Sequence, residues 1–131
     1  MALNILIVDD SIVARAMIKK TLRLAGLPVG ETYEACNGEE GLRLLSDRGV
    51  DLALVDINMP VMNGEEMIHR MRAEPKTQGI PVVVISTEGS HTRIERLEQQ
   101  GVTFIHKPFT PESLRDTLRQ LVGSQYEATV G

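Results

Sequence analysis

The chain has 131 residues, of which 42% are hydrophobic, so it is long enough and apolar enough to form one domain with a real core. Its formal net charge is −4, and its 14 lysine and arginine residues are dispersed, which disfavours direct binding of nucleic acid. The N-terminus lacks a signal-peptide pattern, no apolar segment approaches the roughly 20 residues that cross a bilayer, and Cys36 is the only cysteine. We therefore expect a cytoplasmic protein that has neither a membrane segment nor an internal disulfide.

Five apolar runs typical of β-strands alternate with segments of helical periodicity. This order predicts stacked strand–helix units and a parallel sheet. The predicted strands cover residues 5–8, 31–35, 52–55, 82–85 and 103–106.

The first predicted helix begins after Ser11, a suitable N-cap, runs to about Ala25 and ends at Gly26. A spacing of three to four residues predicts its buried face from four residues, Val13, Met17, Thr21 and Leu24. The second helix has Asn37 as N-cap, with Glu40 three residues later, and ends at Gly49. Its predicted buried residues are Leu42 and Leu45.

A loop over residues 58–64 contains Pro60 and Gly64 and precedes a third helix, which ends at Glu74 before Pro75. The third helix is expected to bury Met67, Ile68 and Met71. The fourth helix, over about residues 91–100, has few apolar anchors beyond Ile94 and Leu97, which predicts a mobile helix.

The last helix begins with Thr110 as N-cap and Pro111 at its first position. Core spacing predicts that it buries Leu114, Leu118, Leu121 and Val122. Residues 123–131 form a short polar segment for which we predict no regular structure.

Polar and charged residues follow four of the predicted strands at the point where each strand ends. Asp9 and Asp10 follow the first, Asp56 the third, Ser86 the fourth and Lys107 the fifth. The carboxyl ends of parallel strands share one edge of a sheet, so these side chains are expected to converge there. Three carboxylates, a hydroxyl and an ammonium suit a divalent cation, such as Mg²⁺, together with a phosphoryl group.

These residues lie in four motifs that resemble the receiver domain of two-component response regulators, of the stand-alone CheY-like kind. The motifs are Val8-Asp9-Asp10-Ser11, Val55-Asp56-Ile57-Asn58-Met59-Pro60 with Asn63-Gly64, Val84-Ile85-Ser86, and His106-Lys107-Pro108-Phe109. The resemblance spans about residues 4–122 and implies a flavodoxin-like doubly wound α/β fold with strand order 2-1-3-4-5, for which CheY is itself a standard example. On this basis residues 1–123 form the receiver domain and residues 124–131 a short polar tail. With no output domain expected, the protein should act by binding a partner in trans.

The resemblance also assigns chemical roles. Asp56 is the expected phosphoacceptor, forming an aspartyl phosphate, and Mg²⁺ is the only expected cofactor. The implied Mg²⁺ ligands are Asp10, Asp56 and the backbone carbonyl of Asn58, with Asp9 acting directly or through water. Lys107 would neutralise one phosphoryl oxygen. A cis Lys107–Pro108 bond, as in the family, would aim the lysine inward.

By the same resemblance Ser86, where the family more often has Thr, donates a hydrogen bond to the phosphoryl group and acts as a switch residue. Its movement would let Phe104 turn inward, where chemotaxis relatives most often have Tyr, and would alter the face formed by the fourth helix, fifth strand and fifth helix. Asn58 and Glu88 occupy the two positions that tune dephosphorylation and match the chemotaxis-type pairing. This pairing implies a comparatively short-lived phosphoryl group.

The implied function is a monomeric signalling switch that is not an enzyme beyond its own phosphotransfer and autodephosphorylation. Its expected partners are a sensor histidine kinase or histidine phosphotransfer protein and an unidentified downstream protein, in a chemotaxis or motility-type pathway, with no nucleic acid and no membrane.

Two alternatives remain open. One is a small Mg²⁺-dependent aspartyl-phosphate hydrolase. Resemblance to such enzymes would require an Asp-x-Asp pattern at the first strand and a cap insertion. The other is a flavin-binding module, in which the first loop should be rich in Ser, Thr and Gly. Asp9 and Asp10 would repel a flavin phosphate, and turnover of phosphate esters would distinguish the hydrolase from the switch.

Overall fold

Five parallel strands form one sheet in the computed structural model, which describes residues 2–87 and 89–130. The strands are β1 (Leu3–Val8), β2 (Val29–Ala35), β3 (Leu52–Val55), β4 (Val82–Ser86) and β5 (Thr103–His106), and within the described residues their order is β2-β1-β3-β4-β5. The intervening helices are α1 (Ile12–Leu24), α2 (Gly38–Asp47), α3 (Gly64–Ala73), α4 (His91–Gln99) and α5 (Pro111–Val130). The doubly wound fold predicted from the sequence is confirmed, with β1 and β2 each beginning two residues before the predicted strand.

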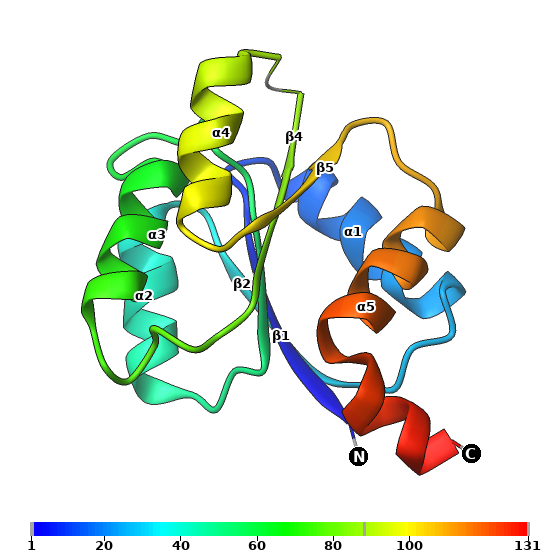
Figure 1. The fold of residues 1–131 in the computed structure, drawn as a ribbon. Coiled ribbons are helices and arrows are strands. Elements are labelled where there is room, and N and C mark those ends of the chain that lie inside the picture. The colour runs from blue at the N-terminus through cyan, green and yellow to red at the C-terminus, as the bar shows by residue number, and fades with distance from the viewer. Residues whose placement is uncertain (1, 88, 131) are drawn as a thin grey trace.

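The helices cover both faces of the sheet (Figure 1). Helices α1 and α5 lie on one face, and α2, α3 and α4 lie on the other. Because alternate residues of a strand point to opposite faces, Ile5 and Ile7 of β1 pack in the cluster with α1 and α5, whereas Leu6 and Val8 pack in the cluster with α2 and α3. No helix among the described residues is long and apolar enough to cross a membrane.

The side of α1 that faces the sheet differs from the prediction. Ile18 and Leu22 are the buried residues of the helix, and Thr21 is half-buried with its hydroxyl donating to the Met17 carbonyl. The predicted residues Val13, Met17 and Leu24 are exposed, as is Ile12 at the start of the helix. The predicted set and the observed set of buried residues have the same spacing of three to four residues. Packing of the helix against β1 and α5 determines which set is buried.

Helix ends largely follow the predicted capping residues. The predicted caps Ser11 and Asn37 accept hydrogen bonds from the backbone N–H three residues later, and Ser113 N–H donates to the hydroxyl of the predicted cap Thr110. Asn63, which was not predicted as a cap, accepts such a bond at the start of α3. Gly26 follows α1 with a φ of 73°, the left-handed conformation that a glycine adopts without strain. The second helix ends at Asp47, before the predicted Gly49.

The last helix is longer than predicted. It continues past Gly123 to Val130, so the absence of regular structure predicted after residue 122 is wrong. One glycine costs a helix only about 1 kcal/mol, and Gln125, Glu127 and Ala128 are good helix formers with no proline among them. Leu114 and Leu118 are buried as predicted, whereas Leu121 is exposed and Val122 lies outside the residues whose side chains are described.

Candidate functional site

The predicted site residues follow the carboxyl ends of β1, β3, β4 and β5. Val8 and Val55 are partners in the sheet, and the Asp56 N–H donates to the Val8 carbonyl at 2.9 Å, so Asp9 and Asp56 emerge side by side. On the next strands the Lys107 N–H donates to the Ser86 carbonyl at 3.0 Å. The alignment of the strands therefore brings Asp9, Asp56, Ser86 and Lys107 to one rim.

Three carboxylates form a cluster at this rim. One oxygen from each of Asp9, Asp10 and Asp56 lies within 4.8 Å of the others. Asp9 is only 2% exposed, Asp56 is half-buried and Asp10 is exposed, so the cluster opens to solvent on one side. Closely spaced carboxylate oxygens with solvent access fit Mg²⁺, which prefers oxygen ligands and retains several waters.

Several hydrogen bonds hold Asp9 in position, in addition to the bond from its backbone N–H to the Ala35 carbonyl. Its carboxylate accepts hydrogen bonds from the Ser11 N–H at 2.9 Å and from Lys107 Nζ at 3.4 Å. Arg15 Nη1 donates to its backbone carbonyl at 2.6 Å. Lys107 thus contacts the buried carboxylate at the centre of the rim, and Arg15 adds a positive charge that the motifs did not indicate.

The surroundings of Asp56 disfavour the ionised form of its carboxylate. Burial raises its pKa above the ordinary value, the nearby Lys107 ammonium opposes this rise, and the charge of Asp9 adds to it. Its Oδ1 accepts a hydrogen bond from the Ile57 N–H at 2.9 Å, and a hydrogen bond from the Ser86 hydroxyl also favours the charged form. A cation bound at the rim would relieve the remaining cost of the ionised carboxylate.

The loop between β3 and α3 borders the carboxylate cluster. Asn58 is exposed, and its side-chain oxygen accepts a hydrogen bond from Arg93 Nη1 at 3.4 Å. Val61 has a φ of 67°, a conformation that is costly for a β-branched residue. At Gly64 an added Cβ would collide with the backbone carbonyl of Asp56, so the glycine is required for α3 to start this close to the site.

The sequence marks Gly64 as a breaker of regular structure and as part of a motif, but it does not indicate the close approach of Gly64 to Asp56 or select Arg15 or Arg93. The two arginines reach the site from helix surfaces, and no local pattern marks such residues.

Of the predicted switch residues, Ser86 interacts with Asp56, and Phe104 lies on β5 opposite Val84 of β4. Ser86 is 1% exposed at the end of β4. Phe104 is half-buried, and its ring packs against that of His106 with centroids 4.6 Å apart. The Lys107–Pro108 bond is cis, as predicted, whereas Glu88 lies outside the described residues.

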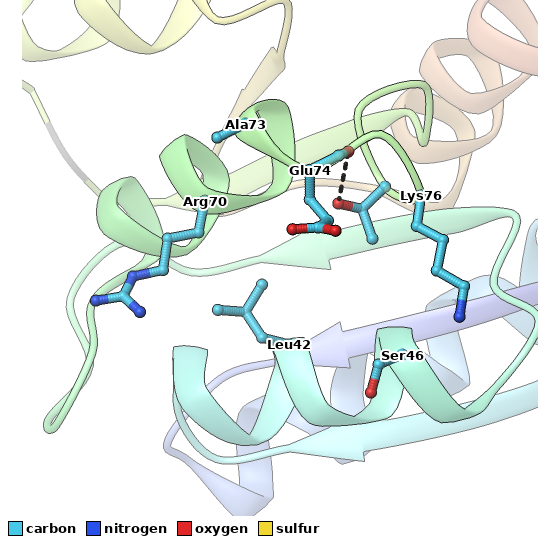
Figure 2. A pocket seen from close by; sticks show the side chains of 7 residues that line it. Leu42, Ser46, Arg70, Ala73, Glu74 and Lys76 are labelled. Atoms are coloured by element: carbon cyan, nitrogen blue, oxygen red, sulfur yellow. Dashed lines mark hydrogen bonds between the residues drawn. The ribbon is translucent and has the colours of Figure 1, made fainter.

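A pocket of about 450 Å³ lies between α2 and α3, away from these residues. Figure 2 shows its lining, which includes Leu42, Ser46, Arg70, Glu74 and Lys76. Helices run antiparallel to the strands in this fold, so the C-terminal end of α3 is near the opposite edge of the sheet. The pocket is therefore separate from the carboxylate cluster.

Comparisons with known proteins agree with this geometry. The profile of the response regulator receiver domain matches residues 5–119. A chemotaxis protein CheY homolog of Campylobacter jejuni is 36% identical over 124 residues, which cover 93% of this chain and 94% of that protein. The chemotaxis protein CheY1 of Helicobacter pylori (strain J99) is 34% identical, with 93% of this chain and 98% of that protein covered.

Solved structures are similar as well. The chain matches chemotaxis protein CheY4 of Vibrio cholerae with a TM-score of 0.80 and 34% identity, covering 92% of this chain and 98% of that one. A CheY-like receiver domain protein of Methanospirillum hungatei gives a TM-score of 0.83 at 25% identity, covering 98% of this chain and 99% of that one. With strand order, carboxylate cluster and sequence in agreement, the chain belongs to the response regulator receiver domain family.

Proposed function

We propose that this protein is a phosphorylation-controlled switch that accepts a phosphoryl group on Asp56 and then binds a partner protein. The observation that carries the proposal is the cluster of Asp9, Asp10 and Asp56, with Lys107 beside it, at one rim of the sheet. The donor would be a sensor histidine kinase or a histidine phosphotransfer protein, and the switch would act in the cytoplasm. The similarity to chemotaxis proteins supports a role in chemotaxis or motility signalling.

Each of the proposed residues has a separate role in phosphoryl transfer. Mg²⁺ held by Asp9, Asp10, Asp56 and the Asn58 backbone carbonyl would offset negative charge on the phosphoryl oxygens. A carboxylate oxygen of Asp56 forms the new O–P bond in line as the P–N bond of the donor phosphohistidine breaks. The histidine nitrogen retains the electron pair of the broken bond and takes up a proton.

Lys107 and Ser86 would stabilise the transferred group. Lys107 Nζ now contacts Asp9, so a short movement of its flexible side chain would bring the ammonium to a phosphoryl oxygen. The Ser86 hydroxyl already interacts with the Asp56 carboxyl and would donate instead to a phosphoryl oxygen. Because Ser86 ends β4, its shift would move the turn that leads to α4.

This movement is the proposed signal. Displacement of the turn after Ser86 would make room for the half-buried Phe104 to rotate inward, away from the His106 ring. The surface of α4, β5 and α5 would then change shape, and the downstream protein would bind there. Asn58 and Glu88 are proposed to set a comparatively short phosphoryl lifetime.

Intact mass after incubation with acetyl phosphate and Mg²⁺ tests the proposal. The wild-type protein should gain one phosphoryl group, whereas Asp56→Asn and a metal-free sample should gain none. Asp116→Asn is a matched control, because it removes an exposed carboxylate from α5 and should leave the adduct intact. No adduct on the wild type would refute the proposal, and steady release of phosphate from small esters would favour the hydrolase alternative.

A further inference from the structure

Helices α3 and α4 are joined by a cluster of three charged side chains, which we call the Glu65 cluster: Glu65, Arg93 and Arg96. Glu65 is the second residue of α3, and its Oε1 lies 3.4 Å from Arg93 Nε. Its Oε2 lies 3.0 Å from Arg96 Nε. The hydrogen bond from Arg96 is the largest of the influences that hold the pKa of Glu65 below its ordinary value, so the carboxylate stays ionised at neutral pH.

Arg93 also contacts the loop that borders the phosphoacceptor. Its Nη1 donates to the side-chain oxygen of Asn58 at 3.4 Å, so this guanidinium contacts α3 and the β3–α3 loop at once. Arg96 contacts Glu65, and no hydrogen bond from Arg96 to the loop is found among the described residues. The two arginines therefore share one acidic partner but differ in their relation to Asn58.

The helix that carries Arg93 depends on such polar contacts for its position. Leu97 is the single fully buried residue of α4 within the described part of the chain. At the other end of the helix, Arg72 of α3 donates to the backbone carbonyls of Gln100 and Gly101 at 2.7 and 3.4 Å. Both ends of α4 are thus held to α3 by arginine contacts, and the end nearer the site is held through Glu65 and Arg93.

We infer that Arg93 is a positioning residue of the phosphoacceptor site, which orders the metal-binding loop by holding Asn58. This inference rests on the proposed function, in which the Asn58 backbone carbonyl is a Mg²⁺ ligand. Residues behind metal ligands orient them, and their loss typically weakens metal binding about 10- to 100-fold. The Arg93–Asn58 bond is long at 3.4 Å and exposed, so a smaller effect is expected here.

The sign of the effect distinguishes positioning from simple charge. Arg93 is a cation near a proposed cation site, so on charge alone its removal should tighten Mg²⁺ binding. If Arg93 orders the loop, its removal should instead weaken Mg²⁺ binding. Asn58 would then be mobile in the metal-free protein, and metal binding would have to restrict its conformational freedom. Lysine keeps the charge but lacks the planar fork with which Arg93 contacts Asn58 and Glu65 together.

Isothermal titration of the unphosphorylated protein with Mg²⁺ tests the inference directly. Arg93→Gln and Arg93→Lys should each raise the Kd for Mg²⁺ at least threefold. Arg96→Gln is the matched control: it also removes one positive charge from the Glu65 cluster and should change the Kd less than twofold. In an Asn58→Ala background, Arg93→Gln should no longer raise the Kd, since the contact through which Arg93 orders the loop is gone.

Several outcomes would overturn the inference. An unchanged or lower Kd for Arg93→Gln would show that Arg93 does not order the loop, and an equal rise for Arg96→Gln would show that the effect comes from a general loosening of α4. A full effect of Arg93→Gln in the Asn58→Ala background would rule out the proposed contact. Phosphorylation by acetyl phosphate, measured on the same wild-type sample, shows separately whether the proposed function itself fails.

Discussion

The strained backbone at Val61 leads to a prediction about stability. Val61 is 76% exposed and adopts a φ of 67°, so it has little apolar burial to lose and an unfavourable conformation to relieve. The left-handed region costs an L-residue about 1 to 2 kcal/mol, and asparagine tolerates it better than other non-glycine residues. We therefore expect Val61→Asn to increase the free energy of unfolding by about 1 kcal/mol. For 131 residues this corresponds to a rise in Tm of about 3 to 4 °C.

Urea denaturation followed by far-UV circular dichroism, with thermal unfolding in parallel, measures the effect. Val13→Asn is a suitable control, because Val13 is 72% exposed but lies within α1. Valine and asparagine have similar helix propensities, so Val13→Asn should change stability by less than about 0.5 kcal/mol. If Val61→Asn were no more stable than the wild type, at an unchanged m-value, the strain assigned to this loop would be refuted.

Two further predictions concern half-buried charged side chains. Burial raises the pKa of Asp56 in the folded state above its value of about 4 in the unfolded chain. Ionisation of this carboxylate therefore lowers the free energy of unfolding as the pH rises above about 4, and the loss is complete above the raised folded-state pKa. In metal-free buffer Asp56→Asn should therefore be more stable than the wild type at pH 7 and should lose this advantage at pH 3. Urea denaturation at the two pH values measures the difference, and equal stability of the two proteins at both pH values would contradict the prediction. Arg72→Met should lower the free energy of unfolding by about 2 to 3 kcal/mol, because it removes charge-assisted hydrogen bonds to the carbonyls of Gln78, Ile80, Gln100 and Gly101. A loss below about 0.5 kcal/mol would mean that water replaces the guanidinium at no cost.

The sequence allowed the sheet and its rim to be predicted because these depend on local patterns. Apolar runs that end in polar residues identify both the strands and the edge where their carboxyl ends meet. The positions of Asp9, Asp56 and Lys107 follow from strand order alone. The roles of these residues in chemistry rest on the resemblance to the family and remain proposals.

Features that depend on tertiary packing could not be predicted in this way. In α1 two stripes have equivalent spacing, and contacts with β1 and α5 select Ile18 and Leu22 over Val13 and Met17. The contact of Arg93 with Asn58 joins residues 35 positions apart, and neither residue carries a sequence signal for the other. The continuation of α5 past Gly123 has no sequence signal of its own, because the short polar segment after the glycine shows no apolar periodicity.

The direction of the chain through the sheet has a practical consequence for handling the protein. Strand β1 begins at Leu3 and runs toward Asp9, and α5 leaves the rim at Pro111 and runs back toward Val130. The start of β1 and the end of α5 therefore both lie at the edge of the sheet remote from the carboxylates (Figure 1). An affinity tag or fluorescent reporter attached before Leu3 or after Val130 would lie at that edge and leave the rim open to a phosphodonor, so surface immobilisation through such a tag presents Asp56 to solution.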